Sequence, residues 1–221
     1  RFVNEDLVID SWCEIKPLFE DLLNREITSV KDLERWMLDR FELEAILDEN
    51  FSWRYIKLQI DTTNKELTEN FDFWIKNIKP KIEPYSNKLN LKFIQNPFLE
   101  ELNQEEYPIY IRDLKNEIKL FHEKNIPLLT EMQCKEREYF NIKGKMSIEV
   151  DGKKLTMQKA EQFLKNTNRN KREEIYHKIS DRRLQDEVAL DNLFDELILL
   201  RQKIAKNAGF DNYRDYMFAA M

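Results

Sequence analysis

The chain has 221 residues, of which 42% are hydrophobic and 35% are charged, and it contains only three glycines and six prolines. So few turn-forming residues leave little room for an all-β sandwich or barrel, whereas many Glu, Lys, Leu and Ile residues favour long helices with charged outer faces. The formal net charge is −6 and basic residues are interspersed with acidic ones, which argues against nucleic acid as a partner.

We therefore expect a mainly α fold, an elongated array of helices with one short β-hairpin near residues 145–157 and one long helix near residues 168–208. Two regions are predicted. Residues 1–143 form a helical region, and residues 144–221 combine the hairpin with the long helix and begin the body of a larger protein.

Capping signals mark the first helices. Ser11 can cap a helix that runs to about residue 24, with its apolar residues on one face. Ser29, followed by Asp32 three residues later, resembles a capping box and opens a second helix with apolar residues up to Leu47. A third helix is expected over residues 51–60.

Prolines divide the next stretch. Thr63 is predicted to begin a helix through a capping box, and Pro80 and Pro84 should kink or end that helix because proline lacks a backbone N–H. Residues 85–93 are expected to resume the helix. Pro97 can then occupy the first turn of the next helix.

Helical periodicity returns from residue 107. The spacing of apolar residues predicts a helix over residues 107–121, which Pro127 interrupts, and another over residues 128–140. Gly144 is expected to end that helical period.

A hairpin follows. Residues 146–150 alternate apolar and polar side chains, as in a half-exposed strand, and Asp151-Gly152 is a strong two-residue turn signal. Leu155 and Met157 supply the return strand, and Thr156 or a neighbour starts a short helix that ends near residue 165.

The longest predicted helix covers residues 168–208 and ends at Gly209, which acts as its C-cap. About 40 residues at roughly 1.5 Å per residue make a rod of about 60 Å. A rod of this length does not fit a small isolated bundle, and its apolar stripe needs partners along its length. We therefore expect an uncovered apolar flank if part of a larger protein is missing.

Two histidines are the first candidates for a metal site. His122 begins a stretch that resembles the helical H-E-x-x-H zinc motif, but Ile126 occupies the second histidine position and Pro127 follows at once. A catalytic zinc site generally needs three protein ligands. We interpret this stretch as a chance resemblance.

Charged residues at one-turn spacing surround the other histidine. His177 lies between Glu173 and Asp181, which is either half of a metal site or, as we favour, a set of exposed ion pairs on a helix. A second series at one-turn spacing loosely resembles a di-iron carboxylate array, but a solvated acidic face is the better interpretation. This series consists of Glu187, Asp191 and Asp195.

The two cysteines, Cys13 and Cys134, lie far apart in the sequence. They are too few for a disulfide framework, which suits a reducing cytoplasm, and we expect both to be buried small apolar side chains. A Cys–His nucleophile pair is left open by the sequence. Because no apolar run approaches the roughly 20 residues needed to span a bilayer and no signal peptide is visible, we expect a cytoplasmic protein without a membrane partner.

Aromatic residues fall mostly on the apolar faces of the predicted helices, and we interpret them as core rather than as a peptide-binding surface. Three aromatic residues beyond Gly209 are mixed with charged residues and either face a cleft or pack against the long helix. They are Tyr213, Tyr216 and Phe218.

From Met146 onward the sequence resembles the oligoendopeptidase F-like branch of the thimet oligopeptidase-related zinc metallopeptidases. Three stretches carry the resemblance: MSIEVDGKKLTMQKA, KREEIYHKISDRRLQDEVALDNLFDELILLRQKIAKNAGF and, above all, NAGFDNYRDYMFAA. They cover about a third of the chain. The last stretch, preceded by a long helix, is the most specific.

The resemblance implies a mainly α-helical zinc oligopeptidase with a deep channel that admits short unstructured peptides. In that family two histidines and a downstream glutamate hold zinc, and the motif glutamate takes a proton from the metal-bound water. None of these positions has a match here. We therefore expect no catalytic, cofactor-binding or metal-binding residue in this chain, and no zinc bound to it.

The leading hypothesis is the N-terminal, non-catalytic part of such an enzyme, forming one wall of the substrate channel. Its expected partners are short peptides and the remaining C-terminal catalytic portion of the same protein, which would carry the zinc. The alternative is a stand-alone helical scaffold that binds a protein partner through its aromatic faces.

Overall fold

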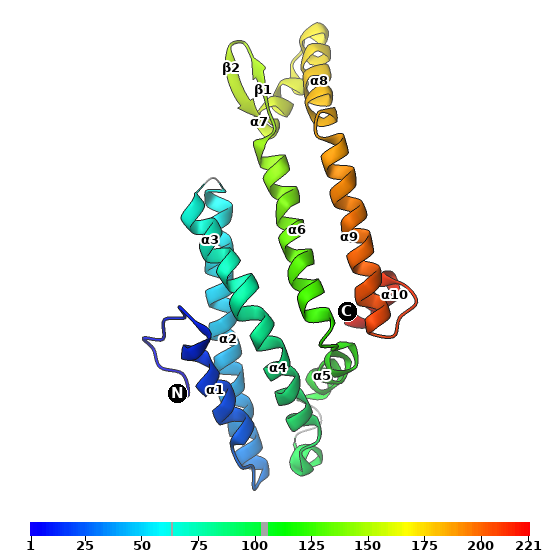
Figure 1. Ribbon diagram of the computed structural model, residues 1–221. Helices are drawn as coiled ribbons and strands as arrows, with labels where there is room; N and C mark the ends of the chain where they lie inside the picture. The colour runs from blue at the N-terminus through cyan, green and yellow to red at the C-terminus, as the bar shows by residue number, and fades with distance from the viewer. Residues whose placement is uncertain (63, 103–105) are drawn as a thin grey trace. The chain divides into compact units, whose positions relative to one another are not determined.

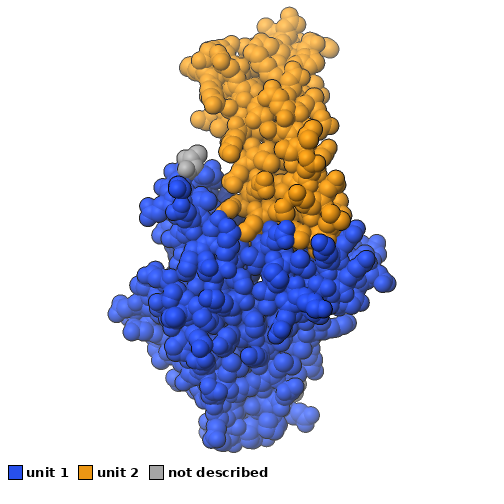
Figure 2. All heavy atoms as spheres, viewed as in Figure 1, with its two compact units in different colours: residues 1–131, 202–221 blue, residues 132–201 orange. Residues whose placement is uncertain are grey.

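The computed structural model describes residues 1–62, 64–102 and 106–221, and it confirms the expected mainly α fold with one short hairpin (Figure 1). Two compact units can be distinguished. Unit 1 comprises residues 1–131 and 202–221, and unit 2 comprises residues 132–201 (Figure 2). The described part of the chain includes no helix that is both long enough and apolar enough to cross a bilayer.

Unit 1 consists of helices and short helical turns. Its helices are α1 (Trp12–Asn24), α2 (Val30–Ile60), α3 (Lys65–Phe73), α4 (Lys79–Ile94), α5 (Pro108–Leu120) and α10 (Tyr213–Ala220). A π-helical turn spans Trp74–Ile78, and a 3₁₀ turn spans Pro97–Glu101 with Pro97 in its first turn, as predicted. Helix α1 packs against α2 and α4, and α5 packs against α4 and α10 (Figure 1).

The predicted cap of α1 is confirmed and forms a complete capping box. The Ser11 hydroxyl accepts a hydrogen bond from the Cys13 N–H at 3.1 Å, and the Glu14 carboxylate accepts one from the Ser11 N–H at 2.7 Å. The hydrogen bond from the Ser11 side chain also lowers the pKa of Glu14. These contacts satisfy backbone donors that the first helical turn would otherwise leave without partners.

Replacing the capping serine with alanine (Ser11→Ala) should lower the free energy of unfolding by about 1 kcal/mol, because the cap hydrogen bond is lost. A carboxylate whose pKa is lower in the folded state than in the unfolded state stabilises the protein at pH values above its unfolded-state pKa. Part of the cap's contribution should therefore disappear as the pH falls through the depressed pKa of Glu14. Urea denaturation at neutral and acidic pH measures both effects. Ser52→Ala, on the exposed face of α2, is the matched control, and an equal loss in both variants would contradict the prediction.

Helix α2 is one continuous helix, so the predicted division between residues 47 and 51 is wrong. The polar residues between the two predicted helices contain neither glycine nor proline. Within this stretch the Asn50 side chain accepts a hydrogen bond from the Arg54 Nε at 2.8 Å, one turn later on the same helix. Polar composition alone does not end a helix when its neighbours supply such contacts.

The predicted effect of the prolines is found in the connection between α3 and α4. The predicted cap Thr63 lies outside the described residues, and Asn64 caps α3 by accepting a hydrogen bond from the Leu67 N–H. The π-helical turn comes directly before Pro80, whose ring would meet the carbonyl of Lys76 in a regular helix. Widening the turn is a known way to relieve this clash. Pro84 lies inside α4 without ending it.

The next helix, α6 (Asn125–Lys145), contributes residues to both units. Pro127 falls in its first turn, where the missing N–H costs nothing, so the predicted interruption lies in the short connection from α5. The helix ends at Lys145, one residue past Gly144, which agrees with the predicted end of the helical period at this glycine.

The core of unit 1 centres on Trp36, which is fully buried. Its indole N–H donates a hydrogen bond to the Leu22 carbonyl at 2.8 Å, and its ring stacks on Phe93 at 6.2 Å. Beside it the Lys92 ammonium donates hydrogen bonds to three carbonyls at the end of α1, those of Leu22, Leu23 and Arg25, at 2.6 to 2.9 Å. A lysine of α4 thus satisfies the last carbonyls of α1.

Unit 2 is built around the hairpin of β1 (Ser147–Val150) and β2 (Lys153–Thr156), an antiparallel pair in which Ile148 faces Leu155. Asp151 and Gly152 have φ values of 52° and 73°, as the predicted two-residue turn requires. The short helix α7 (Met157–Glu161) begins at Thr156, as predicted, and a 3₁₀ turn follows over Gln162–Lys165.

The long helix predicted over residues 168–208 is two helices, α8 (Arg169–Leu184) and α9 (Glu187–Asn207), and α9 contributes residues to both units. At the break the Asp186 N–H donates to the Arg183 carbonyl, three residues earlier, while the Asp186 carbonyl accepts from Leu190. Asp186 also pairs with Arg182. Of the three residues that the sequence offers as N-caps, Asn166, Thr167 and Asn168, the structure uses Asn168, and the predicted C-cap at Gly209 is confirmed.

Candidate functional site

The histidine of the zinc-like stretch lies outside any helix. His122 is in the turn between α5 and α6, where its Nδ1 accepts a hydrogen bond from the Lys124 N–H at 3.2 Å. The helical spacing on which the H-E-x-x-H motif depends is therefore not formed at His122 and Ile126. Across the described residues, no three His, Cys, Asp or Glu side chains come close enough to hold a metal ion.

The other charged candidates are exposed. His177 lies on the surface of α8 beside Tyr176, and the acidic series of α9 is exposed throughout, as in a solvated face. This series consists of Glu187, Asp191 and Asp195.

The two thiols are free, and one of them corrects a prediction. Cys13 is exposed rather than buried because it lies on the outer face of the first turn of α1, whereas Cys134 is partly buried. The aromatic residues also divide more evenly than expected. Trp36 and Phe93 belong to the core, but Phe194 and Phe218 are 57% and 69% exposed.

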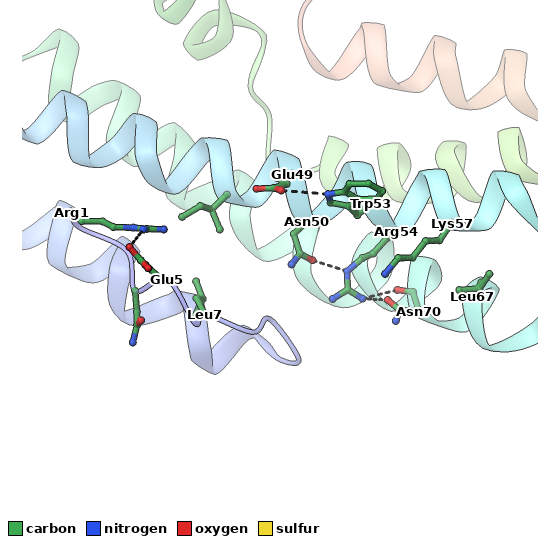
Figure 3. A pocket seen from close by; sticks show the side chains of 12 residues that line it. Arg1, Glu5, Leu7, Glu49, Asn50, Trp53, Arg54, Lys57, Leu67 and Asn70 are labelled. Carbon is green, nitrogen blue, oxygen red and sulfur yellow. Dashed lines mark hydrogen bonds and ion pairs between the residues drawn. The ribbon is translucent and has the colours of Figure 1, made fainter.

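One polar pocket, of about 400 Å³, lies between α2, α3 and the N-terminal segment (Figure 3). Arg54 extends from α2 toward Asn70 of α3, and its Nη2 also donates a hydrogen bond to the Ile9 carbonyl at 2.8 Å. Its guanidinium lies over the Trp74 ring at 5.3 Å. Two nitrogens of Arg54 thus join α2 to α3 and to the N-terminal segment, while its Nε bonds to Asn50 within α2. We therefore interpret this pocket as a structural contact rather than a binding site.

A second cavity, here called cavity A, has a volume of about 260 Å³ and lies at α4, α5, α10 and the start of α6. Tyr216 lines it, so of the two alternatives left open for this residue the cleft is the one found. Tyr216 also contacts the rings of Phe210 and Tyr213, each at 5.7 Å. The polar lining of cavity A consists of Glu83, Ser86, Asn87, Asn90, Glu117, His122, Asn125 and Tyr216.

Cavity B, of about 400 Å³, adjoins cavity A, and the two share Glu83, Ser86 and Glu117. Helices α2, α4 and α5 supply most of its walls. Its polar lining consists of Arg40, Glu44, Asp48, Lys79, Glu83, Ser86, Tyr110 and Glu117. The two cavities form one polar region inside unit 1, contributed by helices that are far apart in the sequence.

A hydrogen-bonded chain links the two cavities. Arg40 donates from Nε to Glu44 at 2.7 Å and from Nη2 to the side-chain oxygen Oδ1 of Asn90, and the side-chain Nδ2 of Asn90 donates to Glu117 at 2.9 Å. Arg40 and Asn90 are each only 3% exposed. Buried polar groups joined in this way hold one another in fixed orientations.

Burial sets the proton affinities in this region. It raises the pKa of Glu83, with Lys79 opposing the shift and the nearby Glu117 adding to it. Burial also raises the pKa of Tyr110 and of Tyr216. Perturbed groups gathered in a cavity are typical of binding or catalytic sites.

Unit 2 has an apolar groove of about 540 Å³ between α6 and α9. Glu136, Asp191 and Arg201 also contribute to it. Its apolar lining consists of Tyr139, Phe140, Leu190, Leu193, Phe194 and Leu197. Two residues of the predicted apolar stripe are thus exposed, Phe194 at 57% and Val188 at 73%, while Leu197 of the same stripe is buried.

Solved structures of three peptidases superpose on nearly the whole chain. An oligoendopeptidase F from Bacillus anthracis strain Ames has a TM-score of 0.87 and 22% identity over 99% of this chain and 41% of its own. Another oligoendopeptidase F has a TM-score of 0.89 and 20% identity over 99% of this chain and 39% of its own. PZ peptidase A with an inhibitor has a TM-score of 0.88 and 18% identity over 99% of this chain and 39% of its own. Identities this low show the fold alone, and the chain spans about two fifths of the length of these proteins.

No curated protein matches the chain significantly. The family model of the peptidase M3 N-terminal domain matches residues 2–121, the region in which the sequence alone offered no specific motif. The resemblance to oligoendopeptidase F-like peptidases is confirmed. Because the match covers more than half of its residues, the chain belongs to the family of the peptidase M3 N-terminal domain.

Proposed function

We propose that the chain is the N-terminal, non-catalytic part of a zinc-dependent oligopeptidase that hydrolyses short peptides, and that it forms one wall of the substrate channel. The family match over residues 2–121 carries this proposal, supported by the superposition of 99% of the chain on two fifths of each solved peptidase. We further propose that the hairpin region, residues 144–221, begins the body of the enzyme, after a helical region over residues 1–143.

Zinc, in this proposal, is held by the remaining C-terminal portion. The described side chains do not fit a catalytic zinc ion, because no group of three possible ligands comes together among them. The role of this chain is then to shape the channel and to select peptides. Two free thiols are in keeping with a reducing cytoplasm as the site of action.

The apolar groove of unit 2 supports the existence of further chain. Exposed aromatic side chains such as Phe140 and Phe194 are costly to leave in water over a contiguous surface, and such surfaces usually mark contacts. The same groove also favours the second candidate function, a helical scaffold that binds a protein partner through its aromatic faces. The two candidates differ in whether a catalytic portion is encoded with the chain.

The test is to read the coding sequence beyond Met221, express the complete protein, and assay it with an internally quenched short peptide. We expect turnover that a chelator abolishes and zinc restores, and no turnover by the 221-residue chain alone. A reading frame that stops at Met221 would favour the scaffold. Chelator-sensitive hydrolysis by the 221-residue chain would contradict the division of labour proposed here.

A further inference from the structure

Two residues that line cavity B each carry a buried hydrogen-bond donor for which the described part of the chain supplies no acceptor. The Arg40 side chain is 3% exposed and its Nη1 has no acceptor in the described part of the chain, although Nε and Nη2 are both bonded. The buried Tyr110 hydroxyl likewise has no described partner. Buried donors without partners are rare in proteins, and each one calls for a physical reason.

The lining of cavity A, including the residues that it shares with cavity B, supplies hydrogen-bond acceptors and negative charge. Neither lysine nor arginine is among the residues that line cavity A, whereas the carboxylates of Glu83 and Glu117 both do so. The buried Asn87 Oδ1 has no donor within the described ranges, and the charge of Lys79 does not outweigh the effect of burial on the Glu83 carboxylate. This end of the region offers acceptors to a ligand that carries N–H donors.

We propose that cavities A and B together bind a primary ammonium group with a neighbouring carbonyl or carboxylate oxygen, as found at the amino terminus of a peptide or in a free amino acid. Glu83, Glu117 and Asn87 receive the ammonium group. Arg40 and Tyr110 donate to the oxygen. For a peptide ligand the proposal deepens the proposed function and rests on it, whereas for a free amino acid it stands alone.

The size and charge of the region fit this ligand class. Cavities of about 260 and 400 Å³ accommodate one or two residues but not a folded protein. The pKa of Glu83, raised first by burial although the charge of Lys79 opposes the shift, agrees with a buried carboxylate that a bound cation would stabilise further. A phosphate group would meet four carboxylates, Glu44, Asp48, Glu83 and Glu117, against the two cations Arg40 and Lys79, and is disfavoured.

The ligand test uses the 221-residue chain and isothermal titration calorimetry with three probes: trialanine, N-acetyl-trialanine and alanine. We expect saturable binding of trialanine that weakens at least about tenfold on acetylation, because acetylation removes the ammonium charge. Alanine that binds as tightly as trialanine identifies a free amino acid as the ligand, and clearly weaker alanine identifies a peptide terminus. Equal affinity of the acetylated probe, or no saturable binding by any probe, overturns the proposal.

Two conservative variants separate binding from folding. Glu83→Gln should weaken trialanine binding about tenfold and yet raise the melting temperature at pH 7, because a neutral amide replaces a carboxylate whose ionisation the fold disfavours. Tyr110→Phe should weaken binding severalfold by removing the unused hydroxyl. A purely structural role for Glu83 does not predict opposite changes in affinity and stability.

Glu66→Gln and Tyr55→Phe are the matched controls, since both residues are exposed and line neither cavity. If the four variants bind trialanine alike, the site is not where we place it. The complete enzyme separates this failure from failure of the proposed function. If it is a chelator-sensitive peptidase and its Glu83→Gln variant keeps the wild-type affinity for trialanine, only the site is refuted. If the chain binds trialanine but belongs to no peptidase, only the proposed function is refuted.

Discussion

Replacing the central tryptophan of unit 1 with alanine (Trp36→Ala) should lower the free energy of unfolding by about 3–5 kcal/mol, the largest loss that we expect from a single substitution. Trp36 is fully buried, stacks on Phe93 with the ring planes 6° apart, and donates to the Leu22 carbonyl at 2.8 Å. The Lys92 ammonium lies over the indole at 5.9 Å. Alanine would leave a cavity where α1, α2 and α4 meet and would remove one buried hydrogen bond.

Urea denaturation followed by circular dichroism measures this loss, and Trp53→Ala is the matched control. Trp53 lies on the same helix but is 54% exposed, so its replacement should cost well under 1 kcal/mol. Trp36→Phe separates the hydrogen bond from the apolar packing, because it keeps most of the apolar volume while removing the indole N–H. A Trp36→Ala variant as stable as Trp53→Ala would show that the packing of unit 1 does not depend on this side chain.

Local signals explain which parts of the fold were predictable. The caps at Ser11, Asn168 and Gly209 and the turn at Asp151-Gly152 all act through bonds or dihedral angles within a few residues. Such features depend little on the rest of the chain. Their sequence signatures therefore predict them well.

Helix continuity was less predictable because it depends on neighbouring elements. Arg54 joins the two halves of α2 by bonding to Asn50 on the same helix and to the Ile9 carbonyl in the N-terminal segment. Conversely, α8 and α9 separate at Asp186 although neither glycine nor proline stands there. The bond from Arg54 to the Ile9 carbonyl is set by tertiary structure, which local propensity does not include, whereas the contacts at Asp186 are local and do not themselves explain the break.

The candidate binding region could be anticipated only in part. Tyr216 stood out as an aromatic residue next to charged ones beyond a helix end. Arg40, Glu83 and Tyr110 carry no motif and belong to three different helices, and their significance arises from burial and from bonds that packing leaves unmade. The sequence shows such residues only as ordinary members of amphipathic helices.

The second large effect is expected in unit 2, where Ile175→Ala should lower the free energy of unfolding by about 2–5 kcal/mol. Ile175 is fully buried on α8, which packs against β1. A two-stranded hairpin is at best marginally stable alone, so it depends on this packing. The surrounding cluster consists of Met146, Ile148, Val150, Met157, Ala160 and Ile179.

Hydrogen exchange of the hairpin amides reports this loss directly. Exchange at β1 and β2 should accelerate strongly in Ile175→Ala, while Tyr176→Ala, one residue along and 60% exposed, should leave it nearly unchanged. Core amides of unit 1 around Trp36 provide an internal reference, since the buried cluster of Ile175 lies wholly within residues 132–201. Unaltered hairpin protection in Ile175→Ala would mean that β1 and β2 are held by something other than α8, and the apolar cluster would then lose its assigned role as the core of unit 2.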